Sequence, residues 1–327
     1  MDIYIEIETL ISYAILHGLV KEDDRILVTN AVLESIGCDS YTEFTEEETA
    51  KIAKKAAEIV YPTEELDRLV EWAAQNGTLS TDTLTFRDLL NSKIMGQVLP
   101  RTSVIRNDFW NKYQSNKEQA TQYFYELNKQ SNYIRTDRIA KNILWEHKSP
   151  YGDLEITINL SKPEKDPRDI AAQKDVVATN YPKCLLCKEN EGYMGRVNHA
   201  GRQNLRTVKL DLANEEWFFQ YSPYIYYNEH CIVFSSEHRP MKIDKACFEH
   251  VLGFVEQFPH YFLSSNADLP IVGGSILSHD HFQGGRHIFP MEKATIKERV
   301  NFKGFEDVEA GIVNWPMSVL RLRGEKD

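Results

Sequence analysis

The chain has no excess of positive charge and no long apolar run. Its 38 lysines and arginines are outnumbered by 49 aspartates and glutamates, which gives a formal net charge of −11. Proteins that bind nucleic acid need a basic surface, so we expect no nucleic-acid partner. A membrane-spanning helix needs roughly 20 apolar residues in a row. The sequence has no stretch of that kind, so we expect no membrane association.

Cysteine is also scarce, with five among 327 residues, and an odd number cannot pair completely into disulfides. The chain starts Met1-Asp2-Ile3, which is acidic where a secretory signal would be basic. We therefore predict a cytoplasmic protein with free thiols or metal thiolates. The length and the 42% hydrophobic content suffice for one large domain or two ordinary ones.

The N-terminal part of the sequence has the apolar spacing of helices. Stripes with helical periodicity are followed by glycine at Gly18 and by Asn76-Gly77, which are typical helix ends. Thr45 precedes three glutamates, which suit the start of a helix. The helices expected here cover residues 7–15, a segment that opens at 45, and residues 66–74, 115–127 and 134–146.

The pattern changes near residues 149–152, where a proline and a glycine interrupt it, and residues 154–160 then alternate like a half-buried strand. Further strands are expected at 206–212, 217–221 and 231–234, and a helix at 245–258. The fold class predicted is α+β, with a helical N-terminal region at 1–148 and a mostly antiparallel sheet with helices packed on it at 149–327. These parts are either two domains or a core with a large helical extension.

The most informative segment is the run from Ser278 to His287, which contains three histidines. In an extended strand, alternate side chains share a face, so His279, His281 and Gln283 would point into one cleft. This arrangement suits attack on phosphorus with one imidazole as nucleophile. A buried structural histidine is the alternative for His281, and His287, beyond the glycines, is expected only to cover the strand.

Cys184 and Cys187 have the spacing of a zinc knuckle. A redox pair and two buried thiols are the alternatives, and redox chemistry is disfavoured because no thioredoxin-like strand–helix unit is evident. The best candidates for two further ligands are His238 and His279, and His230 is a rival to His238. The residues alone do not decide whether these side chains bind zinc.

Together, the Cys-x-x-Cys pair and the later His279-Asp280-His281-Phe282-Gln283 resemble the galactose-1-phosphate uridylyltransferases, a branch of the histidine-triad superfamily. The better-studied class has His-Pro-His-Gly-Gln in these positions. The form found here, with a long helical N-terminal region, is similar to the second, divergent bacterial class. The resemblance implies a histidine-triad-like antiparallel sheet. Because family members extend past Asp327, it also implies that a C-terminal part is missing.

The resemblance implies roles for individual residues. His281 would be the nucleophile and Gln283 would bind the transferred phosphoryl group. A structural zinc ion would be held by Cys184, Cys187, His238 and His279. The substrate-binding residues implied are Ser275 or Ser278 for the phosphate and Lys162, Lys165 and Arg168 for the nucleotide.

The implied reaction is the exchange of hexose 1-phosphates on UDP. UDP-glucose and galactose 1-phosphate would give glucose 1-phosphate and UDP-galactose through a uridylyl-histidine. The second nitrogen of His281 should then be held as N–H, most simply by a backbone carbonyl, so that the attacking nitrogen keeps its lone pair. A homodimer is common in the family. The alternatives are a nucleotide phosphorylase or hydrolase of the same superfamily, and a sugar-nucleotide-binding or zinc-stabilised module without catalysis.

Overall fold

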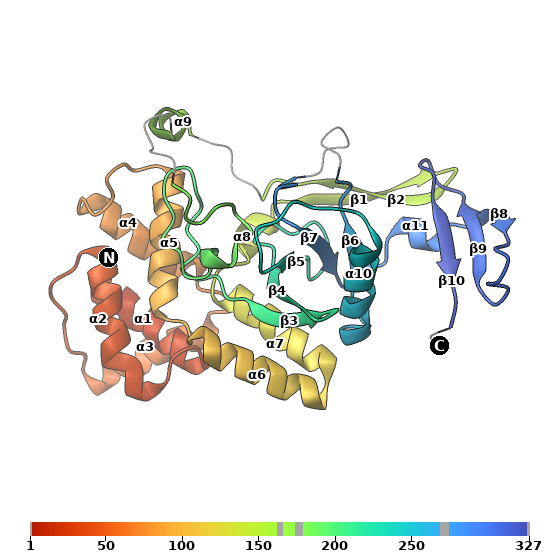
Figure 1. Ribbon diagram of the computed structural model, residues 1–327. Helices are drawn as coiled ribbons and strands as arrows, with labels where there is room; N and C mark the ends of the chain where they lie inside the picture. The colour runs from red at the N-terminus through yellow and green to blue at the C-terminus, as the bar shows by residue number, and fades with distance from the viewer. Residues whose placement is uncertain (1, 162–165, 174–178, 269–274, 326–327) are drawn as a thin grey trace.

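The computed structural model describes residues 2–161, 166–173, 179–268 and 275–325. Figure 1 shows helices gathered at the N-terminal end, a central antiparallel sheet, and a small sheet at the C-terminal end. The fold is therefore α+β, as predicted. No helix among the described residues has the length and apolar character needed to cross a membrane.

Seven helices of 12 to 14 residues make up the N-terminal region. They are α1 (Ile3–Leu16), α2 (Arg25–Ile36), α3 (Glu46–Glu58), α4 (Thr63–Gln75), α5 (Leu84–Gln97), α6 (Thr102–Ser115) and α7 (Lys117–Gln130). The predicted helices at 7–15, 66–74 and 115–127 correspond to α1, α4 and α7. The predicted start at Thr45 is also confirmed, because Thr45 and Glu48 form a reciprocal capping box. Sequence periodicity missed α2, α5 and α6.

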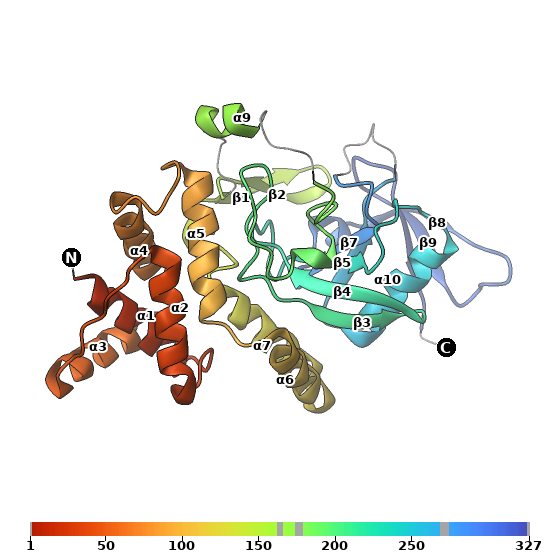
Figure 2. The ribbon, with the colours of Figure 1, turned by 60° about the vertical axis from the view of Figure 1, so that its left-hand side comes forward.

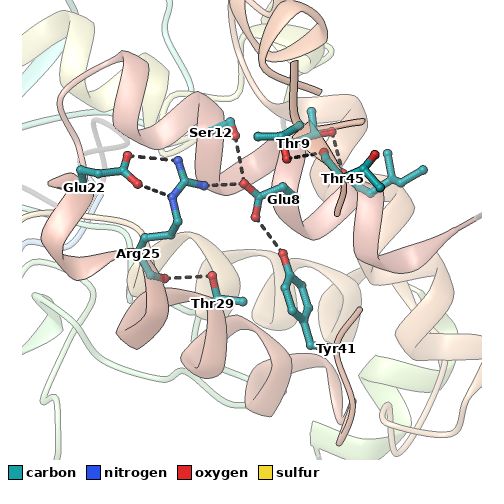
Figure 3. A network of polar contacts seen from close by, with 10 residues as sticks. Glu8, Thr9, Ser12, Glu22, Arg25, Thr29, Tyr41 and Thr45 are labelled. Carbon is teal, nitrogen blue, oxygen red and sulfur yellow. Dashed lines mark hydrogen bonds and ion pairs between the residues drawn. The ribbon is translucent and has the colours of Figure 1, made fainter. Parts of the chain in front are cut away.

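A buried carboxylate ties the first helices together (Figure 3). Glu8 on α1 is 7% exposed and accepts hydrogen bonds from three donors. These are the Arg25 guanidinium at the start of α2, the Tyr41 hydroxyl at 2.7 Å and the Ser12 hydroxyl at 3.3 Å. Burial and the neighbouring Glu8 carboxylate both raise the pKa of Tyr41, so Tyr41 stays a donor. Glu8 thus links α1, α2 and the segment before α3.

The helix predicted at 134–146 is wrong. The chain forms only the short α8 (Thr136–Ile139) and then the strand β1 (Ile143–Ser149). β1 pairs along its whole length with β2 (Gly152–Ile158), and Gly152 makes the turn with a φ of 108°. Cross-strand pairing of apolar and aromatic residues here overrides a local helical pattern. The ribbon straddles the boundary predicted at 148/149, and the division into two parts stays a prediction.

The central sheet has the strand order β3-β4-β5-β7-β6, and every neighbouring pair is antiparallel. The strands are β3 (Val208–Leu212), β4 (Glu215–Tyr221), β5 (Cys231–Ser235), β6 (Phe262–Ser265) and β7 (His281–Gly285). The predicted strands at 206–212, 217–221 and 231–234 are confirmed as β3, β4 and β5. The helix predicted at 245–258 is α10 (Lys245–Gln257), which connects β5 to β6. Strand β6 was not predicted.

One face of this sheet is an aromatic core. The register pairs Phe219 with Val233 and Val233 with Phe282, so these side chains share that face. Phe219 contacts Phe109 on α6, Phe124 on α7 and Phe254 on α10, with ring centroids 5.5 to 6.4 Å apart. Helices therefore cover this face (Figure 1). Because side chains alternate along β7, His281 and Gln283 lie on the opposite face.

Helix α9 (Pro167–Gln173) and the strands β8 (Ile296–Val300) and β9 (Glu309–Val313) lie at the margins (Figure 2). Asp169 on α9 accepts a hydrogen bond of 2.7 Å from Thr83, the residue before α5. The short helix η1 (Glu22–Asp24) leads into α2, and η2 (Lys188–Asn190) follows the Cys-x-x-Cys pair. The C-terminal end consists of α11 (Pro290–Lys293) and a three-stranded antiparallel sheet of β8, β9 and β10 (Leu320–Arg323), in the order β10-β9-β8.

Candidate active site

The site forms at the start of β7, on the sheet face away from the aromatic core. His281 pairs with Phe234 and Gln283 pairs with Ile232 on β5. The two side chains thus share a face, as the strand period of two predicts. The prediction that His279 belongs to the same extended run is wrong, because β7 begins at His281. His279 lies in the preceding turn, and its ring is directed at the two thiols instead of sharing a cleft with Gln283.

A backbone carbonyl sets the tautomer of His281. Its Nδ1 lies 2.8 Å from the carbonyl oxygen of His279, so Nδ1 carries the proton and donates it to that carbonyl. The lone pair is then on Nε2, which lies 3.4 Å from the Nδ2 of Asn266. His281 is 2% exposed, and burial lowers its pKa against the opposing effects of the His279 carbonyl and Asp280. His281 is therefore a neutral imidazole at pH 7, with its lone pair on Nε2.

Two amides and a second imidazole form a chain of polar contacts that reaches this nitrogen through Asn266. The Oε1 of Gln283 lies 3.1 Å from the Nε2 of His230. The Nε2 of Gln283 lies 3.4 Å from the Oδ1 of Asn266. Asn266 follows β6 directly, and His230 directly precedes β5. Sequence analysis missed Asn266 and considered His230 only as a zinc ligand. Neither has a spacing signal, because β6 and β5 bring them to β7 from distant parts of the chain.

The two cysteines and two of the three candidate histidines converge on one point. The Sγ of Cys184 lies 3.5 Å from the Sγ of Cys187 and 3.2 Å from the Nδ1 of His279. The Sγ of Cys187 lies 3.2 Å from the Nδ1 of His238. All four donor atoms lie within 4.8 Å of one another. His230 is not part of this group and contacts Gln283 instead.

The donor set and its geometry fit a metal ion. Around a tetrahedral zinc ion, bond lengths of about 2.0 to 2.3 Å place the ligand atoms roughly 3.3 to 3.8 Å apart. The Nε2 of His279 lies 2.9 Å from the Ser235 carbonyl oxygen, so it donates its proton there and leaves Nδ1 free to bind a metal. All five cysteines are free, and burial raises the pKa of Cys187 to about 11. A bound cation would reverse that effect on the thiol.

Asn190 holds the Cys-x-x-Cys turn in place. Its Nδ2 donates to the carbonyl oxygens of Cys184 and Cys187, at 2.8 Å each, and its Oδ1 lies 2.6 Å from the Nε2 of His199. Asn190 is 1% exposed. The loop that carries both thiols is thus fixed by protein contacts, independently of any ion.

The other predicted substrate-binding residues are exposed or lie outside the described residues. Ser275 and Ser278 are exposed on the turn before His279, where Ile276 has a φ of 55°. Arg168 is exposed on α9 and forms an ion pair of 2.8 Å with Asp166. Figures 1 and 2 both show α9 away from β7. Lys162 and Lys165 lie outside the described residues.

The residues that depart from the better-studied motif have contacts of their own. Phe282 stacks on Trp217 in the aromatic core, with centroids 5.0 Å apart and an interplanar angle of 18°. Asp280 forms an ion pair of 3.2 Å with Arg239. His287 stacks on Tyr227, and its Nε2–H donates a hydrogen bond of 2.8 Å to Glu155 on β2. Asp280 and Phe282 thus anchor the strand on either side of His281, and the contacts of His287 are with Tyr227 and Glu155.

Comparison with known proteins shows the family of this chain. Family models described as the N-terminal and C-terminal domains of galactose-1-phosphate uridyl transferase match residues 19–240 and 254–327. Proteins named galactose-1-phosphate uridylyltransferase are 54% identical in Halalkalibacterium halodurans, over 99% of this chain, and 50% identical in Clostridium acetobutylicum and Butyrivibrio fibrisolvens, each over 97%. The chain spans 62% of the length of the first two relatives and 79% of the third. No solved structure matched. The chain belongs to the galactose-1-phosphate uridyl transferase family.

Proposed function

We propose that this chain carries the nucleotidyl-transfer site of a UDP-glucose–hexose-1-phosphate uridylyltransferase, with His281 as the nucleophile. The observation that carries the proposal is the hydrogen bond of 2.8 Å between the Nδ1 of His281 and the His279 carbonyl oxygen. This bond commits one nitrogen to a proton and leaves Nε2 as a nucleophile on a neutral ring. The relatives that bear this name support the reaction.

In the first half-reaction, Nε2 of His281 attacks the α-phosphorus of UDP-glucose. A P–N bond forms as the bond between that phosphorus and the bridging oxygen breaks, and glucose 1-phosphate leaves. The uridylylated ring is then cationic, and its Nδ1–H donates to the His279 carbonyl, which stabilises the positive charge. The leaving phosphate is weakly basic, so the step needs no strong general acid.

In the second half-reaction, an oxygen of galactose 1-phosphate attacks the same phosphorus. The P–N bond breaks, UDP-galactose leaves, and neutral His281 is restored. The NH2 group of Asn266 lies 3.4 Å from the Nε2 of His281, and that of Gln283 lies 3.4 Å from the Oδ1 of Asn266. Both would donate to the non-bridging oxygens as charge moves onto them. One such preorganised donor contributes about 3 kcal/mol to transition-state stabilisation.

We infer that the four-residue group of Cys184, Cys187, His238 and His279 holds a structural zinc ion. Zinc suits two thiolates and two imidazoles in tetrahedral geometry. The ion would help to position His281. Holding the ring of His279 in place also holds its backbone carbonyl, which accepts the Nδ1 proton of His281. The role of the ion is therefore to stabilise the turn before β7, with no part in bond making.

Isotope exchange tests the reaction. The chain is incubated with UDP-glucose and labelled glucose 1-phosphate, and label in UDP-glucose is measured in the absence of any other acceptor. Exchange supports transfer through a covalent intermediate. Release of UMP into water would favour a hydrolase. Formation of UDP or another nucleotide when inorganic phosphate is added would favour a phosphorylase. Binding of UDP-glucose with no exchange would favour a non-catalytic module. His281→Ala is the control and should show no exchange.

Other parts of the assignment remain our proposals. Ser275 or Ser278 would contact the phosphate, and Lys162, Lys165 and Arg168 the nucleotide. We also propose a reducing compartment such as the cytoplasm, supported by five free cysteines. Size determination by light scattering tests for a homodimer.

A further inference from the structure

The side chain of Gln283 can help phosphoryl transfer in only one of its two orientations. A carboxamide has two ends of nearly the same shape and of opposite hydrogen-bonding character. Only the NH2 group can donate to a phosphoryl oxygen, whereas the carbonyl oxygen would repel it. A rotation of 180° about the last side-chain bond exchanges the two ends. Something must therefore select the orientation.

The described contacts of this carboxamide come from two residues. The Oε1 lies 3.1 Å from the Nε2 of His230, and the NH2 group lies 3.4 Å from the Oδ1 of Asn266. Ser264 donates to the backbone carbonyl of Gln283 at 3.1 Å, so it does not orient the side chain. The shorter of the two amide contacts, and the one to the carbonyl end, is with His230.

His230 is itself held rigidly. It is 2% exposed, and the rings of Tyr227 and Tyr226 lie against it with centroids 4.7 and 5.6 Å away. Its Nδ1 lies 3.2 Å from the Tyr224 carbonyl oxygen, and its own carbonyl accepts a hydrogen bond of 2.9 Å from the Ser222 N–H. The next residues enter β5, which pairs with β7 beside Gln283. A buried ring on a neighbouring strand is a fixed reference for the amide.

We propose that His230 is a positioning residue, whose Nε2–H holds the carbonyl end of Gln283 and so turns the NH2 group toward the reacting phosphoryl group. This inference rests on the proposed function of His281. It requires a proton on Nε2 of His230, and because Nδ1 lies 3.2 Å from the Tyr224 carbonyl oxygen, which can only accept, the ring would carry both protons, against the effect of burial, which lowers its pKa. A ring with only Nδ1 protonated would instead attract the NH2 end and turn Gln283 the wrong way.

The kinetic test uses two variants of nearly matched size. His230→Gln places an amide NH2 group close to the position of Nε2, whereas His230→Leu fills space without a donor. The rate of uridylyl-His281 formation is measured by rapid mixing with UDP-glucose and intact-mass detection, and the Kd for UDP-glucose by calorimetry in a His281→Ala background. His230→Leu should slow uridylylation roughly 10- to 100-fold and change Kd by less than about threefold. His230→Gln should recover most of the rate.

A double-mutant cycle shows whether His230 acts through Gln283. In a Gln283→Ala background, His230→Leu should slow uridylylation no further, because the group that His230 orients is already absent. A multiplicative loss in the double variant would overturn the proposal, since it would mean that His230 acts on the reaction independently of Gln283.

A third measurement uses only the wild-type chain and needs neither enzymatic activity nor a folded variant. Long-range ¹⁵N–¹H spectra of the wild-type chain report which nitrogens of each histidine carry a proton. A proton on Nε2 of His230 is expected, and a bare Nε2 overturns the inference. If the wild type forms no adduct, the proposed function of this chain fails, and the spectrum still decides the orientation of Gln283. If the wild type forms the adduct and His230→Leu forms it as fast, only the positioning role fails.

Discussion

His279 and His281 are two residues apart, yet they belong to neighbouring regions with opposite chemistry. The first region is the thiol–imidazole cluster formed by Cys184, Cys187, His238 and His279. There the Ser235 carbonyl holds the Nε2 proton of His279 and turns Nδ1 toward the sulfur atoms. In the site around His281, the His279 carbonyl holds the Nδ1 proton of His281 and leaves Nε2 beside the amide of Asn266. One backbone carbonyl per ring thus decides which nitrogen is available.

The comparison also shows how the two regions are coupled. His279 supplies its side chain to the cluster and its backbone carbonyl to His281. The position of His279 in the cluster therefore also places the carbonyl that holds the Nδ1 proton of His281. The following experiments separate the contributions of the two regions, from the largest expected effect to the smallest.

Removing the nucleophile should have the largest effect. His281→Gly should lower isotope exchange by about 10⁴-fold or more, because no neighbouring group can take over the covalent step. The far-ultraviolet circular dichroism spectrum should be unchanged, since the ring lies off the aromatic core. His147→Ala, which alters an exposed histidine on β1, is the matched control and should retain wild-type exchange. Substantial exchange by His281→Gly would place the chemistry elsewhere.

The residue between His281 and Gln283 should affect folding instead of chemistry. Phe282→Ala removes a ring that is 1% exposed and stacked on Trp217. The cavity should lower the free energy of unfolding by about 3 to 5 kcal/mol, measured by urea denaturation. Phe302→Ala, at a position that is 41% exposed, should change it by less than about 0.5 kcal/mol. Equal effects of the two variants would contradict the placement of Phe282 in the aromatic core.

Disrupting the cluster should act on metal content first. Cys187→Ser replaces a thiolate ligand and should weaken zinc binding by more than about 100-fold, measured by competition with a chromophoric chelator. Cys38→Ser is the control, because Cys38 lies outside the cluster. Metal binding unaffected by Cys187→Ser would disprove the zinc assignment.

The smallest effect expected is a pH dependence. Burial lowers the pKa of His281 below its usual value of about 6.5, and only the neutral ring attacks phosphorus. The rate of uridylylation should stay constant as the pH falls from 7.5 to about 6.5. It should then fall below the pKa, about tenfold per pH unit. A rate that declines already between pH 7.5 and 6.5 would mean that the ring is not neutral as the structure indicates.

Part of the site could be predicted from the sequence, because its signals are local. The strand period of two correctly grouped His281 with Gln283, and the Cys-x-x-Cys spacing identified the thiols that the structure brings to His238 and His279. The start of the strand could not be predicted. The turn before it contains Ile276 with a positive φ, a conformation that the sequence does not signal.

The residues around the nucleophile could not be predicted, because they depend on strand pairing. His230 and Asn266 reach Gln283 only because β5 and β6 flank β7. In the N-terminal region, the predicted helix at 134–146 failed for a similar reason, since β1 is stabilised by its pairing with β2. Local periodicity identified most long helices, whereas contacts between distant strands had no signature in one sequence.

The most direct test of the central claim is the intact mass of the chain after brief exposure to UDP-glucose, followed by peptide mapping. The account predicts the addition of one uridylyl group, located on His281 and removed by added hexose 1-phosphate. An unchanged mass, or an adduct on another residue while His281 stays free, would contradict it.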